Sequence, residues 1–267
     1  MDEHSYRGRG NIHAEDVDED GDASSPSFEP HKDLIKQRFL WYYDTYLHTI
    51  QSNMSLIPDD ESFVKMPFES SSNGMDGKFR YGELERRLLR IRAQLDAETQ
   101  RWGPEGRIQQ QQDSGVAANL QRQFEQAVEV YKRDDRVTLD IGLVEGNPFV
   151  WQLTYFGRPM TNLDGGLFKI KILMSPRFPD ELPRVRFETP LFHQRISKDG
   201  VVCYFATRPE DIKSHIEAVI EALEEESPPY DPRTMVHPEA SKLFWGSTED
   251  RKEYHRRLRR AVQRSME

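Results

Sequence analysis

The sequence has a single cysteine, Cys203, among its 267 residues. A lone thiol cannot form an internal disulfide, and it cannot supply the paired cysteines of a zinc site. Cys203 is therefore either a buried packing residue or a reactive thiol. We expect no metal ion and no other cofactor, and such sparing use of cysteine suits the reducing cytosol or nucleus.

Long apolar runs are also missing. No stretch approaches the ~18 apolar residues of a transmembrane helix, and the first residues, Met1-Asp2-Glu3-His4, are polar and acidic. They are unlike a signal or transit peptide, so the sequence predicts no membrane span and a cytoplasmic or nuclear location. The formal net charge of −9 argues against a protein that mainly coats nucleic acid.

Residues 1–30 are strongly acidic. They carry nine Asp and Glu residues against only Arg7 and Arg9, and almost nothing apolar except Phe28. Such a segment cannot bury enough surface to offset the entropy cost of ordering it. We therefore expect a disordered acidic tail.

Residues 31–102 change character and predict a helical extension. Apolar side chains recur at helical spacing over 31–54. A second series steps by three and four residues, namely Tyr81, Leu84, Leu88, Ile91 and Leu95. This seam covers about two heptads, which is too short to establish a coiled coil. The second helix could pair antiparallel with the first, or residues 78–102 could mediate association with a second copy or a partner.

Residues 103–116 contain Gly103-Pro104 and a run of glutamines, which predicts a linker. Beyond it, residues 117–267 have the pattern of one folded α+β domain. A helix over 117–132 precedes four strand signals, which lie at 137–141, 149–156, 167–173 and 184–187. Their short connections predict an antiparallel meander. Helices are then expected near 212–223, 238–244 and 248–264.

Several short motifs follow one another in this domain. They are Trp151-Gln152 running into Gly157-Arg158-Pro159, Gly165-Gly166-Leu167-Phe168, Phe178-Pro179 with Leu182-Pro183-Arg184-Val185, His193 ten residues before Cys203, Asp199-Gly200, and Asp231-Pro232 with Val236 and Pro238-Glu239-Ala240. In their order and offsets these motifs resemble the ubiquitin-conjugating (E2) family over residues 118–262. The resemblance implies the UBC fold, with a helix, four antiparallel strands, a cysteine-bearing loop and C-terminal helices.

The resemblance also implies a chemistry. Cys203 would accept ubiquitin or a ubiquitin-like modifier from an activating (E1) enzyme as a thioester, and would pass it to a lysine amine or a ligase (E3). Asp231 matches an acidic position near the incoming lysine, although an ordinary helix cap before Pro232 is an equal alternative. His193 matches a histidine that braces the loop.

The sequence departs from the family pattern at positions that bear on activity. Gln194 and Arg195 replace the Pro and Asn of the His-Pro-Asn motif. Arg195 therefore occupies the position of an Asn that, in the family, stabilises the oxyanion or holds the active-site loop. The loop after Cys203 is shorter than in the family. Asp180 stands where many ligases contact an apolar residue. Arg122 matches a basic position used in E1 and ligase contacts, and Pro209 belongs to the same predicted docking surface.

These departures keep two further readings open. The domain could be an E2-like adapter that binds ubiquitin or partner proteins without conjugating them. Alternatively, residues 31–102 could form a structural adapter that carries the E2 domain as a passenger. The exposure of Cys203 separates the first alternative from an active enzyme, because a conjugating thiol must be reached by its substrates.

Overall fold

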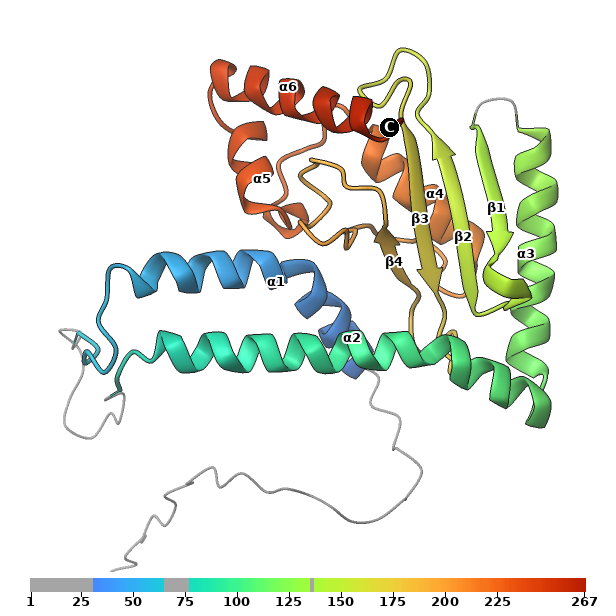
Figure 1. Ribbon diagram of the computed structural model, residues 1–267, viewed down its shortest axis with the longest axis horizontal. Coiled ribbons are helices and arrows are strands. Elements are labelled where there is room, and N and C mark those ends of the chain that lie inside the picture. The colour runs from blue at the N-terminus through green and yellow to red at the C-terminus, as the bar shows by residue number, and fades with distance from the viewer. Residues whose placement is uncertain (1–30, 65–76, 135–136) are drawn as a thin grey trace, which may run out of the picture.

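The structure is a computed structural model that describes residues 31–64, 77–134 and 137–267 (Figure 1). The predicted acidic tail, residues 1–30, lies outside the described residues. Within the described ranges, no helix combines the length and the apolar character needed to cross a membrane.

Four strands form an antiparallel meander in the order β1-β2-β3-β4. They are β1 Leu139–Leu143, β2 Val150–Phe156, β3 Leu167–Leu173 and β4 Arg184–Phe187. The predicted α+β fold is confirmed, and β3 and β4 have the predicted bounds. β1 begins at 139 rather than 137, because its register is set by the pairing of Leu139 with Tyr155 and of Leu143 with Trp151.

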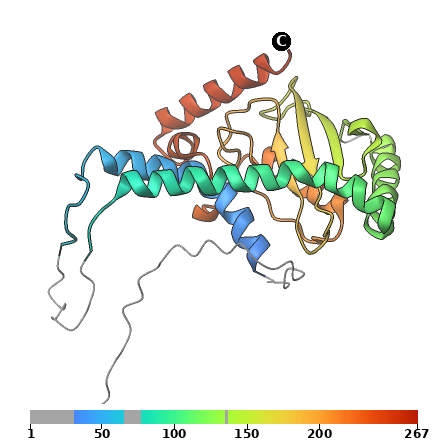
Figure 2. The ribbon, with the colours of Figure 1, turned by 60° about the horizontal axis from the view of Figure 1, so that its bottom comes forward.

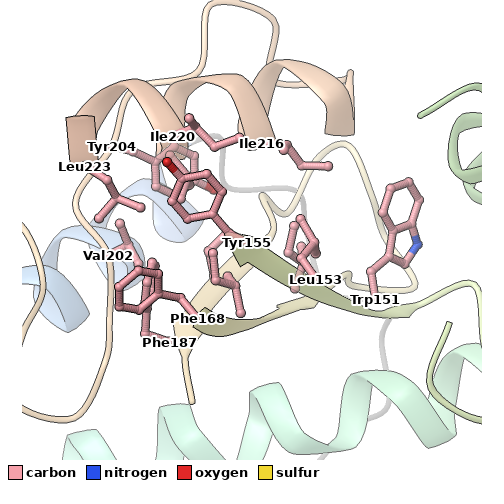
Figure 3. Close-up of a cluster of buried hydrophobic side chains, with 14 of the residues drawn as sticks. Trp151, Leu153, Tyr155, Phe168, Phe187, Val202, Tyr204, Ile216, Ile220 and Leu223 are labelled. Carbon is pink, nitrogen blue, oxygen red and sulfur yellow. The ribbon is translucent and has the colours of Figure 1, made fainter. Parts of the chain in front are cut away.

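One face of this sheet is covered by α4 (Ile212–Glu224). Leu153 and Tyr155 of β2 lie opposite Ile170 and Phe168 of β3, and Ile216 and Ile220 of α4 close over them (Figure 3). Alternation along a strand sends these side chains to the same face. Each fully buried side chain of this kind stabilises the fold by about 1.5–3 kcal/mol. The main core of the protein therefore lies between the sheet and α4.

The remaining helices of the domain surround this core. α3 (Gly115–Arg133) packs beside β1, while α5 (Pro238–Phe244) and α6 (Thr248–Arg264) pack on each other. Two 3₁₀ turns, η1 (Val144–Gly146) and η2 (Pro232–Thr234), lie between the larger elements. α6 starts with a capping box, in which the Asp250 N–H donates to Ser247 Oγ over 3.2 Å and the Ser247 N–H donates to the Asp250 carboxylate over 2.9 Å. The helices predicted at 238–244 and 248–264 have these same bounds.

The N-terminal extension is an antiparallel pair of helices, α1 (Lys32–Met54) and α2 (Tyr81–Gln112). Lys36 Nζ lies 2.5 Å from Glu98 towards one end, and Gln51 donates to Glu85 over 3.0 Å towards the other. Figures 1 and 2 show the pair lying across one end of the sheet rather than apart from the domain. The antiparallel alternative is therefore the one that the structure adopts.

The apolar seam of α2 is only partly used in this pairing. Leu88 is buried with Tyr43 and Ile50 of α1, whereas Leu84 and Ile91 are 46% and 41% exposed. Arg92 takes the inward position beside Ile91 and is 7% exposed. Association with a second copy through residues 78–102 stays a prediction.

The linker predicted over 103–116 is wrong for most of its length. α2 continues to Gln112, and only Asp113 and Ser114 separate it from α3. Glycine and proline disfavour helix in isolation, but here packing overrides that preference. Trp102, Gly103 and Gly106 are buried, and the Asn147 side chain donates to the Gly103 carbonyl over 3.1 Å. This end of α2 is thereby attached to the start of β2.

The contact between α2 and β2 gives a first prediction. A Cβ on Gly106 would lie 2.5 Å from ring atoms of Phe149, whereas one on Gly82, near the start of the same helix, would lie 3.3 Å from the flexible Asp59 carboxylate. We expect Gly106→Ala to lower the free energy of unfolding by about 1–3 kcal/mol, because overpacking outweighs the better helix propensity. Urea denaturation measures the change.

Gly82→Ala is the matched control for this substitution. It adds the same methyl group to the same helix and should leave stability unchanged or raise it by about 0.5–1 kcal/mol. If both variants are equally stable, the close packing of α2 on Phe149 is not a constraint on the fold.

Candidate active site

Cys203 directly follows a tight turn made by residues 196–202. Ile196 pairs with Val202 across the turn, and the Cys203 N–H donates to the Arg195 carbonyl over 2.9 Å. Gly200 turns the chain with φ of +87°, and a Cβ there would collide with the carbonyl of Phe187. Glycine alone accepts both conditions without strain. The turn thus sets Cys203 opposite Arg195.

The second side of the site is the segment 231–237. The N–H groups of Val236 and His237 both lie within hydrogen-bonding distance of the Gln194 carbonyl, at 3.3 and 3.4 Å. The Cys203 thiol lies 3.6 Å from the Arg233 carbonyl oxygen, to which it can donate. The structure therefore brings together Cys203, His193, Arg195 and Asp231 from two separate parts of the chain.

Cys203 itself is fully buried. Its exposed fraction is 0%, and it forms a small cluster with Trp41 and Val236, against which Tyr42 and Val201 pack. Burial raises the pKa of the Cys203 thiol to about 12, and the positive charges of Arg195 and Arg38 offset only part of that rise. In this arrangement the thiol is protonated at neutral pH and is not a nucleophile.

His193 is buried beneath the same turn. Its Nδ1 accepts a hydrogen bond from the Arg195 N–H over 3.2 Å. Burial, together with the charges of Arg195 and His237, lowers the pKa of His193 to about 3. A neutral imidazole that accepts a backbone N–H is placed to brace the turn, as expected from the sequence.

Arg195 is held by an ion pair. Its Nη2 lies 3.1 Å from a carboxylate oxygen of Glu225, just past the end of α4, and the Arg195 side chain is 11% exposed. Among the described residues, its buried Nε–H has no hydrogen-bond partner. An unpaired donor on a buried cation is costly unless another group takes the bond, so this atom is available to an oxygen that enters the site.

Asp231 both caps a turn and forms an ion pair. Its carboxylate accepts the Arg233 N–H over 2.9 Å at the start of η2, and the Arg233 guanidinium holds it at 2.8–3.1 Å. The Arg233 hydrogen bonds lower the pKa of Asp231. Asp231 therefore does cap the turn η2, which was one of the two roles that the sequence left open. Its carboxylate is also ionised and partly exposed.

The predicted docking residues do not all gather in one place. Gln123, next to Arg122 on α3, donates to the Glu210 carbonyl over 3.1 Å and accepts the Ile212 N–H over 2.8 Å, which places α3 beside the loop of Pro209. Asp180 lies instead on the turn after β3, along a groove lined also by Lys32 and Trp102 of the N-terminal helices.

Sequence reasoning missed several residues at this site. Arg233 and Glu225 hold the two charged candidates, and a search for opposite charges close to Asp231 would have found the first. Trp41 and Tyr42 come from α1, more than 150 residues before Cys203 in the sequence. No motif in the sequence points to that contact.

A metal centre is not evident in the described part of the chain. Within these ranges, no three His, Cys, Asp or Glu side chains converge in a way that could hold a metal ion.

Comparison with known proteins agrees with this geometry. The family model for ubiquitin-conjugating enzymes matches residues 119–262. The chain is 29% identical over 157 residues to "Ubiquitin-conjugating enzyme E2 7" of Triticum aestivum, covering 52% of this chain and 89% of that protein. It is 27% identical over 135 residues to "Ubiquitin-conjugating enzyme E2 3" of Arabidopsis thaliana, covering 50% of this chain and 88% of that protein.

The cysteine-bearing turn and the meander with its helices define an E2-type domain. With more than half of its length matched, the chain belongs to the ubiquitin-conjugating enzyme family. α1 and α2 both lie outside the residues that the family model matches.

Burial of His193 predicts a pH dependence of stability. The folded protein keeps His193 neutral down to about pH 3, whereas the unfolded chain takes up a proton near pH 6.5. The free energy of unfolding therefore decreases as the pH falls below 6.5. His193 alone lowers it by about 2 kcal/mol between neutral pH and pH 5. His193→Gln keeps an acceptor and does not titrate, so its stability should fall less steeply between pH 7 and pH 5.

Urea denaturation at several pH values measures this slope. His48→Gln, at an exposed position of α1, is the control and should leave the slope unchanged. His237, whose pKa burial lowers to about 4, keeps part of the dependence in every variant. Parallel curves for the wild type and His193→Gln would contradict the assignment of His193 as a buried neutral imidazole.

Proposed function

We propose that the protein conjugates ubiquitin or a ubiquitin-like modifier through a thioester on Cys203. The observation that carries this proposal is the site itself. The chain's single cysteine follows a glycine turn, ten residues after a buried histidine, in a domain of the E2 family. The expected partners are the modifier, an E1 enzyme, and a ligase or a substrate lysine.

The reaction is two successive acyl transfers. The Cys203 thiolate attacks the thioester carbonyl of the modifier on E1, the new C–S bond forms, and the E1 thiolate leaves. A lysine amine, or a ligase thiol, then attacks the new thioester, loses a proton and expels the Cys203 thiolate. Each step passes through a tetrahedral oxyanion, so the protein must position the reactants and stabilise that charge.

Arg195 is our candidate for stabilising the oxyanion. Glu225 holds one end of its guanidinium, while the buried Nε–H has no partner among the described residues. A preorganised donor of this kind is worth about 10²–10³ in rate when it is aimed at the developing charge. The charge of Arg195 also favours the thiolate of Cys203.

Asp231 is our candidate for orienting the acceptor lysine. Its carboxylate is ionised and lies on the segment whose Arg233 carbonyl is near the Cys203 thiol. An incoming ammonium would compete with Arg233 for this carboxylate and would be directed towards the thioester. We further propose that Arg122 and Pro209 form one docking surface, and that Asp180 limits which ligases can bind.

A second function is favoured by one observation. Because Cys203 is fully buried, the domain in this arrangement has the properties of an E2-like adapter that binds partners without forming a thioester. The two functions predict opposite outcomes in a charging assay.

Thioester formation is the direct test of the proposed function. The full-length protein is incubated with E1, ATP and ubiquitin and run on non-reducing gels. We expect one band of added ubiquitin that is lost on treatment with thiol and absent in Cys203→Ala. The absence of any band with ubiquitin and with other modifiers, each with its own E1, both in the wild type and in the Trp41→Ala variant that uncovers Cys203, would favour the adapter.

The role of Arg195 is tested by following transfer from the preformed thioester to free lysine in a single turnover. Arg195→Ala should lower the rate constant by about 10²–10³, and Arg195→Asn, which restores the family's residue, should recover part of the loss. Arg107→Ala is the matched control, since Arg107 also pairs with a glutamate, Glu145, but on an exposed surface. Equal rates in all variants would exclude Arg195 from the reaction.

A further inference from the structure

Helix α1 lies directly over the candidate nucleophile. Trp41 and Tyr42 enclose Cys203 together with Val201 and Val236 of the E2 domain. Trp41 is 4% exposed and also packs edge-on against Phe205, with ring centroids 5.5 Å apart. The thiol is thus covered by a segment that precedes the E2 domain in sequence.

Polar contacts attach α1 to both sides of the cysteine loop. On one side, the Tyr42 hydroxyl donates to the Arg233 carbonyl over 2.6 Å and the Thr45 hydroxyl donates to the Met235 carbonyl over 3.3 Å. On the other side, the Lys198 N–H donates to the Asp44 carboxylate over 2.6 Å. α1 therefore bridges the two segments that form the site.

α2 contacts both the cysteine turn and α1, and so helps to hold α1 over Cys203. Arg92 forms an ion pair with Asp199, within the turn that leads to Cys203, and lies 4.9 Å from the ring centroid of Tyr43 on α1. A second ion pair joins Arg92 to Asp96 on its own helix. Both helices of the pair therefore contact the turn that leads to Cys203.

This cover is incompatible with thioester exchange. Reacting atoms must approach to about 3–3.5 Å with correct alignment, and a carbonyl attached to a protein cannot reach a thiol that has no exposed surface. We propose that α1 is an autoinhibitory cap, which must move off Cys203 before the protein can be charged. This proposal rests on the proposed function of Cys203.

The packing of α1 is suited to such a displacement. The main apolar core of the E2 domain contains no residue of α1. Trp41 belongs to a small cluster with Cys203, and Tyr43 and Ile50 belong to one with α2. Near the start of α1, Asp33 forms a buried ion pair with Arg184 of β4. A cavity of about 60 Å³ also lies between the two helices and the domain, lined by Leu40, Trp41, Thr99 and Val202 among others. Moving α1 therefore leaves the apolar core between the sheet and α4 in place, and its main cost is the ion pair that joins Asp33 to Arg184 of β4.

The test compares the reactivity of Cys203 in full-length variants. Tyr42→Phe with Asp44→Ala removes one bond to each side of the loop and leaves Trp41 in place. We expect the rate of alkylation by iodoacetamide, followed by mass spectrometry, to rise at least tenfold, and the rate of thioester formation with E1, ATP and ubiquitin to rise with it. Ser52→Ala is the matched control, because within the described ranges the Ser52 hydroxyl donates to the His48 carbonyl of α1 itself.

Trp41→Ala is a second variant that removes the cover without relying on hydrogen bonds. The cap is contradicted if the alkylation rate of Cys203 is unchanged in both variants. It is equally contradicted if Cys203 of the wild type already reacts as fast as a free thiol. Thermal unfolding of each variant shows that any gain in reactivity does not come from global unfolding.

The two proposals fail in different ways. If alkylation is faster in the variants but no thioester forms with any modifier, the cap is supported and the conjugating function is contradicted. If the wild type forms the thioester rapidly and the variants give no increase, the conjugating function stands and the cap falls.

Discussion

The carbonyl oxygen of Arg233 joins the parts of this molecule that matter for its chemistry. It accepts the Tyr42 hydroxyl of α1 and lies within reach of the Cys203 thiol. Its position is fixed by the 3₁₀ turn that Asp231 caps, and that segment is tied to the His193 loop through the Gln194 carbonyl. One backbone group thus connects the candidate nucleophile, the predicted lysine-orienting carboxylate and the N-terminal helix. Displacing any one of them shifts the contacts of the other two.

The E2 domain and helix α1 are stabilised by different kinds of interaction. The E2 domain is held by apolar burial between its sheet and α4, a non-directional force that grows with the area removed from water. α1 is held on that domain by hydrogen bonds of Tyr42 and Asp44, by the ion pair between Asp33 and Arg184, and by the packing of Trp41 and Tyr42 around Cys203. The hydrogen bonds of α1 that face solvent can be exchanged for water with little net cost, whereas separating the buried pair of Asp33 and Arg184 is the larger cost of displacing α1.

Much of the fold followed from the sequence because local signals and tertiary packing agreed. The alternation of residues 167–173 gave strand bounds that the structure reproduces, and the helix expected near 248–264 has the same bounds in the structure. Prediction failed where packing opposed local preference: Gly103 and Gly106 remain helical because their lack of a side chain lets α2 approach Phe149. The members of the site, His193, Arg195 and Cys203, were identified through the resemblance of the motifs to the E2 family. Their cover by Trp41 was not, because a contact between residues so far apart in the chain leaves no local pattern.

The close approach of α2 to Phe149 has a consequence for how α1 behaves once it is released. Because α2 stays attached to the E2 domain, α1 remains tethered and competes for its site at a high effective concentration, which is independent of protein concentration. A partner that binds the released helix must overcome this intramolecular competition, so its apparent affinity is lower than for the same helix as a free peptide. Activation then depends on the partner's differential affinity for the open arrangement, and dilution does not produce it.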